Sequence, residues 1–237
     1  MKWLVPKQHG AWAMLMLPFA LGIAAGQPSW LHLPLFMGWL LLYFATYPLL
    51  MAVKGKNKRY YLKWLAIYMS MAAVTLVIPL FSVWQFMFFG LAMLPFLAVN
   101  AYFARMNKER ALLNDFCAIA AFSIGGLASY YAGTGILDSV GWGVWGLSML
   151  FFVGSTFFVK TMIREKNNSK YRWISWGYHL VLVAGCWGIG LPLLALAYAP
   201  SAVRAIGFYG RKMSAVKVGV WEILNSLYFI VVLLFFF

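Results

Sequence analysis

The chain has 237 residues, of which 64% are hydrophobic and 19% aromatic, while only 10% are charged. Soluble domains are about 45–50% apolar and about 25% charged, and one soluble core cannot bury such an excess of apolar surface. This composition excludes a soluble globular protein and also a disordered one, which requires low hydrophobicity. The formal net charge of +14 is typical of nucleic-acid-binding proteins, but in a membrane protein it reports topology. We therefore expect no nucleic-acid partner.

Nine stretches of the chain approach the length of about 20 mostly apolar residues that a membrane-spanning helix needs. They are residues 10–26, 30–53, 62–80, 83–104, 113–133, 140–161, 173–189, 191–207 and 217–237. The seventh and eighth are short for two complete spans and meet at a Gly- and Pro-containing break at 188–192, so they form two short helices or a re-entrant hairpin. We predict an all-α, polytopic bundle of about nine transmembrane helices that forms one membrane domain, residues 1–237.

All 19 Lys and Arg residues fall in five segments that alternate with connections without Lys or Arg between the spans. These segments contain Lys2 and Lys7; Lys54, Lys56, Lys58, Arg59 and Lys63; Arg105, Lys108 and Arg110; Lys160, Arg164, Lys166, Lys170 and Arg172; and Arg204, Arg211, Lys212 and Lys217. This alternation is the positive-inside pattern. It predicts a multi-pass protein of the cell membrane with a cytoplasmic N-terminus and an external C-terminus. The basic face should attract anionic lipids of the bilayer, at about 1 kcal/mol per base near the surface.

Two glycine motifs favour helix packing over ligand binding. Gly141–Gly146 matches G-x-G-x-x-G, but a dinucleotide fingerprint requires a preceding strand in a βαβ unit. Gly22 and Gly26 form a GxxxG, which permits close helix approach but is common by chance in such sequences. The three histidines have no metal-pair spacing, so we expect no protein-held transition metal. Cys117 and Cys186 lie in apolar runs, which indicates no disulfide framework.

A small set of polar residues remains within about two turns of the predicted cytoplasmic surface. They are His9, Asn100, Arg105, Arg110, Asn114, Asp115, Lys160, Arg164, His179, Glu222 and Asn225. Ionisable groups inside a membrane cost roughly 2.5–3.5 kcal/mol at a helix centre and mark functional sites by default. We therefore predict that these residues line one cytoplasm-facing cavity.

The most embedded members of this set, Asp115, His179 and Glu222, are the candidate catalytic acid–base residues. The others are candidate ligand-binding residues, and the basic ones among them are suited to a phosphate or carboxylate head group. Lys160 and Arg164 are four residues apart at the end of a helix and so lie on one face. In the alternative, structural interpretation, Glu109 and Glu165 pair with neighbouring arginines and Asp115 caps the fifth helix.

Several stretches of the sequence resemble the YwiC-like family of bacterial membrane proteins. They are Pro6–Leu15 (PKQHGAWAML), Lys108–Asp115 (KERALLND), Val159–Glu165 (VKTMIRE) and the pair Tyr178–His179. The resemblance extends over essentially the whole chain.

The chain is also distantly similar to the UbiA-type intramembrane prenyltransferases, which have nine helices and a cytoplasmic site. Pro6, Gly10, Leu15, Pro18 and Gly22 follow the order of that family's first helix, and Tyr102 with Lys108 and Arg110 loosely matches the end of its fourth. This similarity implies binding or modification of an isoprenoid or another amphipathic lipid. The alternatives are a small anion transporter and a membrane assembly or accessory subunit.

The UbiA-type enzymes hold Mg²⁺ at two aspartate-rich motifs, after the second and sixth helices, and the metal bridges the diphosphate oxygens. In this chain, residues 47–63 contain no acid and residues 156–172 contain only Glu165. One carboxylate cannot form two metal sites. We therefore do not expect a Mg²⁺ cofactor, and an enzyme of this type would be a transferase without the usual aspartate-rich motifs.

Overall fold

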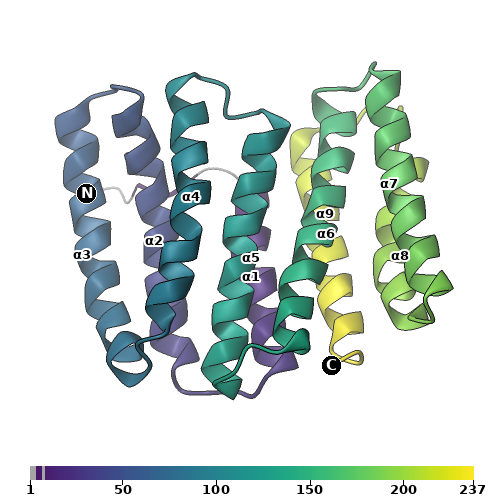
Figure 1. The fold of residues 1–237 in the computed structure, drawn as a ribbon. Helices are drawn as coiled ribbons and strands as arrows, with labels where there is room; N and C mark the ends of the chain where they lie inside the picture. The colour runs from purple at the N-terminus through teal and green to yellow at the C-terminus, as the bar shows by residue number, and fades with distance from the viewer. Residues whose placement is uncertain (1–3, 7–8) are drawn as a thin grey trace. The chain divides into compact units, whose positions relative to one another are not determined.

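The computed structural model describes residues 4–6 and 9–237, which form nine helices and no strand (Figure 1). The helices are α1 (His9–Ala25), α2 (His32–Val53), α3 (Lys58–Ser82), α4 (Phe86–Arg105), α5 (Leu112–Thr134), α6 (Ser139–Ile163), α7 (Ser169–Gly188), α8 (Pro192–Gly207) and α9 (Ala215–Leu233). This confirms the predicted all-α class. Six of these helices, α2 to α6 and α9, are long and apolar enough to cross a membrane, as a multi-pass membrane protein requires.

The region that was open to two interpretations, residues 173–207, forms the separate helices α7 and α8. Their connection contains Gly190 with φ of 81°, in the left-handed region that glycine adopts without steric cost. Pro192 then occupies the first position of α8, where its missing N–H leaves no hydrogen bond unmade.

The chain divides into two compact units, Met1–Gly146 and Leu147–Phe237, which we describe separately. In each unit the Lys- and Arg-rich connections lie at one end of the helices, which we call the basic end (Figure 1). These connections are residues 54–57 and 106–111 in the first unit, and 164–168 and 208–214 in the second. The opposite, non-basic end carries residues 26–31, 83–85 and 135–138 in the first unit and 189–191 in the second.

In the first unit, α1 and α5 pack backbone to backbone. A Cβ atom on Gly22 would lie 2.8 Å from the backbone nitrogen of Tyr130 and would overlap the carbonyl oxygen of Gly126. A Cβ atom on Gly133 would meet the backbone of Gln27 in the same way. Such close contact is what small residues allow between membrane helices, so the GxxxG of Gly22 and Gly26 lies at a helix contact.

Buried hydrogen bonds join α1, α2 and α5 at the non-basic end of this unit. The Ser129 hydroxyl donates to the carbonyl oxygen of Phe19 (2.7 Å), and Nε2 of His32 lies 2.8 Å from the carbonyl oxygen of Ser129. Nδ1 of His32 in turn lies 2.9 Å from both the backbone nitrogen and the carbonyl oxygen of Ser29. Because a carbonyl oxygen only accepts hydrogen bonds, Nε2 donates to Ser129, so His32 serves helix packing.

The second glycine motif, Gly141–Gly146, lies inside α6, and a Cβ atom on Gly141 would lie 2.7 Å from Cδ1 of Tyr130. Gly141 therefore serves helix packing, whereas a Cβ atom on Gly143 or Gly146 would meet no atom within 4 Å. Asp138 precedes α6, and its Oδ1 accepts hydrogen bonds from the backbone nitrogens of Gly141 (3.1 Å) and Val140 (3.0 Å). The bond from Gly141 is the main cause that holds the pKa of Asp138 below its ordinary value, and a further bond from Tyr130 acts in the same direction.

The α1–α5 contact predicts different effects for alanine at two helical glycines. Gly22→Ala should destabilise the protein by about 1–3 kcal/mol because the new methyl group overlaps the α5 backbone. Gly143→Ala in α6 is the matched control, since a Cβ there meets no atom within 4 Å, and it should be neutral or stabilising by about 0.5–1 kcal/mol. Thermal unfolding in detergent, followed by circular dichroism, measures both. Equal unfolding temperatures for the two variants would contradict the backbone contact.

Candidate functional site

The second unit buries an ion pair between Arg204 of α8 and Glu222 of α9, which are 4% and 9% exposed. Nη1 of Arg204 donates to Oε1 of Glu222. Nη2 donates to the hydroxyl of Ser155 on α6 (3.1 Å), and this hydroxyl donates to Oε2 of Glu222. Nearby, Nδ2 of Asn225 donates to Oγ of Ser201 (2.9 Å). We call Ser155, Ser201, Arg204, Glu222 and Asn225 the polar core.

Residue spacing places the polar core inside its helices. Ser201 and Arg204 are three residues apart in α8, as are Glu222 and Asn225 in α9, so each pair lies on one helix face. At a rise of about 1.5 Å per residue, Glu222 lies about 10 Å and Ser155 about 12 Å along their helices from the basic end. At such a depth in a bilayer, charged groups must find their partners within the protein.

Apolar layers enclose the polar core on both sides along the helices. Toward the non-basic end, Phe151 stacks on Phe229 with ring centroids 4.3 Å apart, and Tyr198 packs against Phe229. Toward the basic end lies a buried cluster of Phe158, Met162, Ala205 and Val218. The Arg204 guanidinium also lies 4.5 Å above the Phe158 ring, a cation–π contact. These layers lower the local dielectric and strengthen the electrostatics of the core.

The polar core retains buried atoms that have no hydrogen-bond partner. They include Nε of Arg204, Oδ1 of Asn225 and Oγ of the adjacent Ser226, all on residues no more than 6% exposed. Native proteins leave few such atoms, and each one calls for a water, an ion or a functional explanation. The core therefore offers a spare donor and a spare acceptor in addition to its internal bonds.

His179 lies on α7 and is 1% exposed. Its Nδ1 lies 2.6 Å from the carbonyl oxygen of Ser175, to which it donates. Nε2 has no partner and faces Gly154 of α6, where a Cβ would lie 2.9 Å from it. Gly154 adjoins Ser155, so His179 is near the polar core. Glu222, which we predicted as its acid–base partner, is instead bound to Arg204 and Ser155.

The predicted site residues of the first unit gather at its basic end. Asn100, Arg105, Arg110, Asn114 and Asp115 lie at or beside the connection between α4 and α5. Nδ2 of Asn100 donates to the carbonyl oxygen of Asn114 (3.4 Å), and Nδ2 of Asn114 donates to that of Glu109 (2.7 Å). Arg105 and Arg110 are exposed.

Three structural expectations for this region need comment. Glu109 pairs with Lys54 from the α2–α3 connection and not with a neighbouring arginine, because the two connections meet at the basic end. The N-cap of α5 is Ala111, and Asp115 lies within the first helical turn, so the expectation that Asp115 caps this helix is wrong. His9 begins α1, but its side chain lies outside the described residues.

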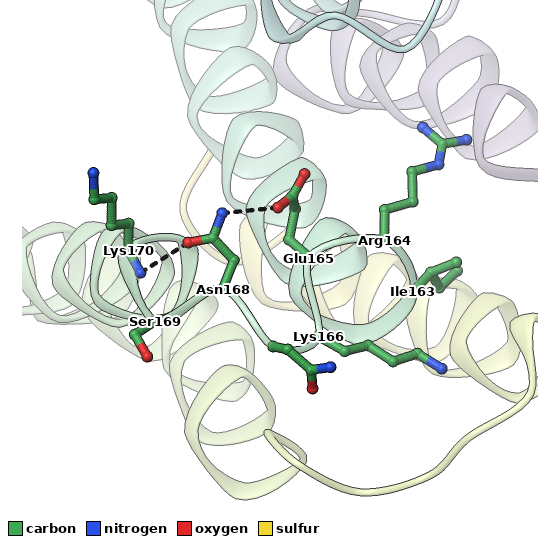
Figure 2. A pocket seen from close by; sticks show the side chains of 8 residues that line it. Ile163, Arg164, Glu165, Lys166, Asn168, Ser169 and Lys170 are labelled. Atoms are coloured by element: carbon green, nitrogen blue, oxygen red, sulfur yellow. Dashed lines mark hydrogen bonds between the residues drawn. The ribbon is translucent and has the colours of Figure 1, made fainter.

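Arg164 lines an open surface hollow of about 600 Å³ at the basic end of the second unit, which we call the basic cavity (Figure 2). The cavity is lined by Ile163, Arg164, Glu165, Lys166, Asn167, Asn168, Ser169 and Lys170. Glu165 does not pair with an arginine here but accepts a hydrogen bond from Nδ2 of Asn168 (2.9 Å). Figure 2 shows the side chains of Arg164, Lys166 and Lys170 pointing in different directions away from this bond. The lining contains these three bases and one acid, Glu165, so it is basic in composition.

Lys160 and Arg164 lie one helical turn apart but differ in exposure. Lys160 is 7% exposed inside α6, whereas Arg164 is exposed and follows Ile163, the last residue of the helix. The backbone nitrogen of Arg164 still donates to the carbonyl oxygen of Lys160 (3.0 Å), as in an α-helical turn.

A second cavity, of about 360 Å³, lies in the first unit near its non-basic end. Its lining comes from α1 to α5 and consists of Phe19, Leu35, Trp39, Leu42, Leu76, Pro79, Leu80, Phe86, Met87, Phe89, Gly90, Leu91, Met93, Leu94, Gly125 and Ala128. Trp39 has the one polar side-chain atom of this lining, and it donates to the carbonyl oxygen of Leu15 (3.4 Å). None of the predicted site residues whose side chains the structure describes lines this apolar cavity.

Sequence reasoning missed Arg204 and Ser155. Arg204, which the sequence groups with the bases before the last helix, lies in the last turn of α8 and is buried, so its charge is paired inside the protein. The sequence does contain a signal for Arg204, because it lies in the apolar stretch 191–207, three residues after Ser201. Glu222 and Asn225 have the same spacing in the apolar stretch 217–237. Among the described residues, no three His, Cys, Asp or Glu side chains lie together as a metal site requires.

The ion pair predicts strongly non-additive effects on stability. Arg204→Ala or Glu222→Ala alone should each cost about 3–5 kcal/mol, because each leaves an uncompensated buried charge. The double variant Arg204→Met/Glu222→Leu should lose much less, since it replaces both charges by apolar groups of similar size. Chemical unfolding in mixed micelles measures all three. A double variant that is as unstable as the sum of the single variants would contradict direct pairing.

Comparison with known proteins places the chain in a family. The YwiC-like protein family model matches residues 5–130. The protein with the printed name "Uncharacterized protein YwiC" from Bacillus subtilis (strain 168) is 43% identical over 238 residues, covering 100% of this chain and 99% of the relative. An "Uncharacterized protein" from Haemophilus influenzae is 39% identical over 234 residues, covering 99% and 98%. No solved structure matches the chain. The protein therefore belongs to the YwiC-like family.

Proposed function

We propose that this protein binds an amphipathic lipid within the membrane and that the apolar cavity of the first unit holds its hydrocarbon chain. The cavity itself is the observation that carries the proposal. Its volume of about 360 Å³ falls within the range of roughly 300–1,000 Å³ of small-molecule sites. Its wall offers a hydrocarbon surface, and its single polar atom is already hydrogen-bonded.

The rim of the cavity supports entry from the bilayer. Leu80 of α3 and Met87 and Leu91 of α4 line the cavity and are between 36% and 53% exposed, so their outer surfaces face hydrocarbon when these helices span a membrane. A lipid chain gains no hydrophobic free energy on moving from the bilayer into this cavity, because lipid tails are as apolar as leucine. Preference for one lipid chain over the bulk lipid must then come from van der Waals contacts with the cavity wall. The aromatic side chains of Phe19, Trp39 and Phe86 in this wall can make such contacts with an isoprenoid or acyl chain.

The position of the cavity changes the expected geometry of binding. It lies near the α3–α4 connection, residues 83–85, at the non-basic end of its unit, and not among the basic side chains. The basic residues predict a cytoplasmic N-terminus and an external C-terminus. In this orientation the hydrocarbon chain of the lipid would enter the cavity from the outer half of the membrane. Anionic lipids would then contact the basic connections at the opposite face as a separate interaction.

The proposal is for lipid binding, not for turnover. The wall of the apolar cavity contains no carboxylate, imidazole or ammonium group that would act as an acid or base. A relation to the UbiA-type prenyltransferases remains a proposal that rests on the residue pattern of α1 and on the number of helices. It favours an isoprenoid chain among the amphipathic lipids.

Gly90 offers a direct test of the cavity. It lines the cavity, and a Cβ there meets no atom within 4 Å, so Gly90→Phe should fill the space without moving the backbone. Gly143→Phe is the matched control on an equally open helix surface away from the cavity. Native mass spectrometry of gently purified protein should show bound lipid in the wild type and in Gly143→Phe, and at least tenfold less in Gly90→Phe.

Two results would count against lipid binding. One is equal retention of the same lipid by Gly90→Phe and by its control, which would place the lipid elsewhere. The other is a wild-type protein that carries no lipid but copurifies in fixed stoichiometry with another membrane protein, which would favour an accessory subunit.

A further inference from the structure

We propose that the polar core of the second unit binds a small anion at Arg204, and that Glu222 must take up a proton for this anion to bind. The inference is independent of lipid binding, because it concerns other residues in the other unit. In this proposal Arg204 is the cation that binds the anion. Glu222 neutralises Arg204 when no anion is bound, and the anion displaces it.

The charge balance leads to the coupling with a proton. The Arg204 guanidinium is 4% exposed between two apolar layers, and Glu222 now neutralises it. If an anion replaced the carboxylate at Arg204, the core would hold two negative charges against one positive charge, which a low-dielectric site disfavours strongly. One proton added to the Glu222 carboxylate for each anion bound keeps the net charge of the core unchanged.

The hydrogen bonds of the core suit this exchange. The spare Nε–H of Arg204 is a donor for the anion, and the Ser155 hydroxyl, which now donates to Glu222, becomes a second one. Protonated Glu222 gains an O–H that needs an acceptor. Asn225 lies one turn further on the same face of α9, and its buried Oδ1 has no partner, so it can accept this bond.

The same unit carries the means to attract an anion. The basic cavity at its basic end is lined by Arg164, Lys166 and Lys170, whose fields raise the local anion concentration. Along α6 the buried Lys160 lies between this cavity and Ser155. The charged and titratable groups near the core are then Lys160 on α6, His179 on α7, Arg204 on α8 and Glu222 on α9.

The test is the thermal stability of the full-length protein in detergent at pH 5 and pH 8. Chloride or nitrate is compared with gluconate, a bulkier anion, at equal ionic strength. Because the anion binds only when Glu222 is protonated, its affinity should be at least tenfold higher at pH 5, seen as a larger rise in unfolding temperature. Glu222→Gln imitates the protonated acid and keeps its size, so this variant should respond to the anion equally at both pH values.

The variant Arg204→Met/Glu222→Leu retains the basic connections and separates the core from surface effects. It should show no anion response at either pH. The proposal is overturned if this double variant responds like the wild type, which would place the anion at the surface. A wild-type response that is absent or independent of pH would overturn it as well, and that measurement does not depend on the folding of any variant.

Discussion

A polar group inside a membrane has no water to bind, so each one that the helices carry must find its partner within the protein. The first unit meets this constraint with neutral groups, since His32 and Ser129 join α1, α2 and α5 through backbone carbonyl oxygens. The second unit meets it with charges, in the ring of Arg204, Glu222 and Ser155. In both units these bonds lie where the helices must also pack closely, and glycine or serine at the contact provides the room.

The number and limits of the helices could be predicted from the sequence because hydrophobic length and the placement of bases depend on local composition alone. Glu222 and Asn225 could be identified for the same reason, as polar residues three apart inside an apolar stretch. Their partners could not, since α8 and α9 bring Arg204 to Glu222 across 18 residues. The position of Arg204 near a predicted helix end is typical of a base that marks the cytoplasmic side. This position gives no information on whether the side chain points to the surface or into the protein. The apolar cavity of the first unit depends on gaps between side chains of five helices, which no local pattern records.

The few carboxylates of the chain are largely used within the protein. Glu109 pairs with Lys54, Asp138 binds the first turn of α6, Glu165 binds Asn168, and Glu222 binds Arg204. A diphosphate-binding Mg²⁺ centre needs several carboxylates at one place, and these four are committed to four separate places.

Stability alone does not account for the charges in the polar core. A buried ion pair rarely stabilises a fold more than well-packed apolar side chains of the same size do, because desolvation offsets the attraction. Here the pair also leaves Nε of Arg204 and Oδ1 of Asn225 without partners, and each unpaired buried group carries a cost of about 1–3 kcal/mol. A core selected only to join α6, α8 and α9 would fill this space with leucine and phenylalanine, as the layers around Phe151 and Phe158 already do. Spare hydrogen-bonding groups beside a buried charge are consistent with the reversible anion that we propose for this core.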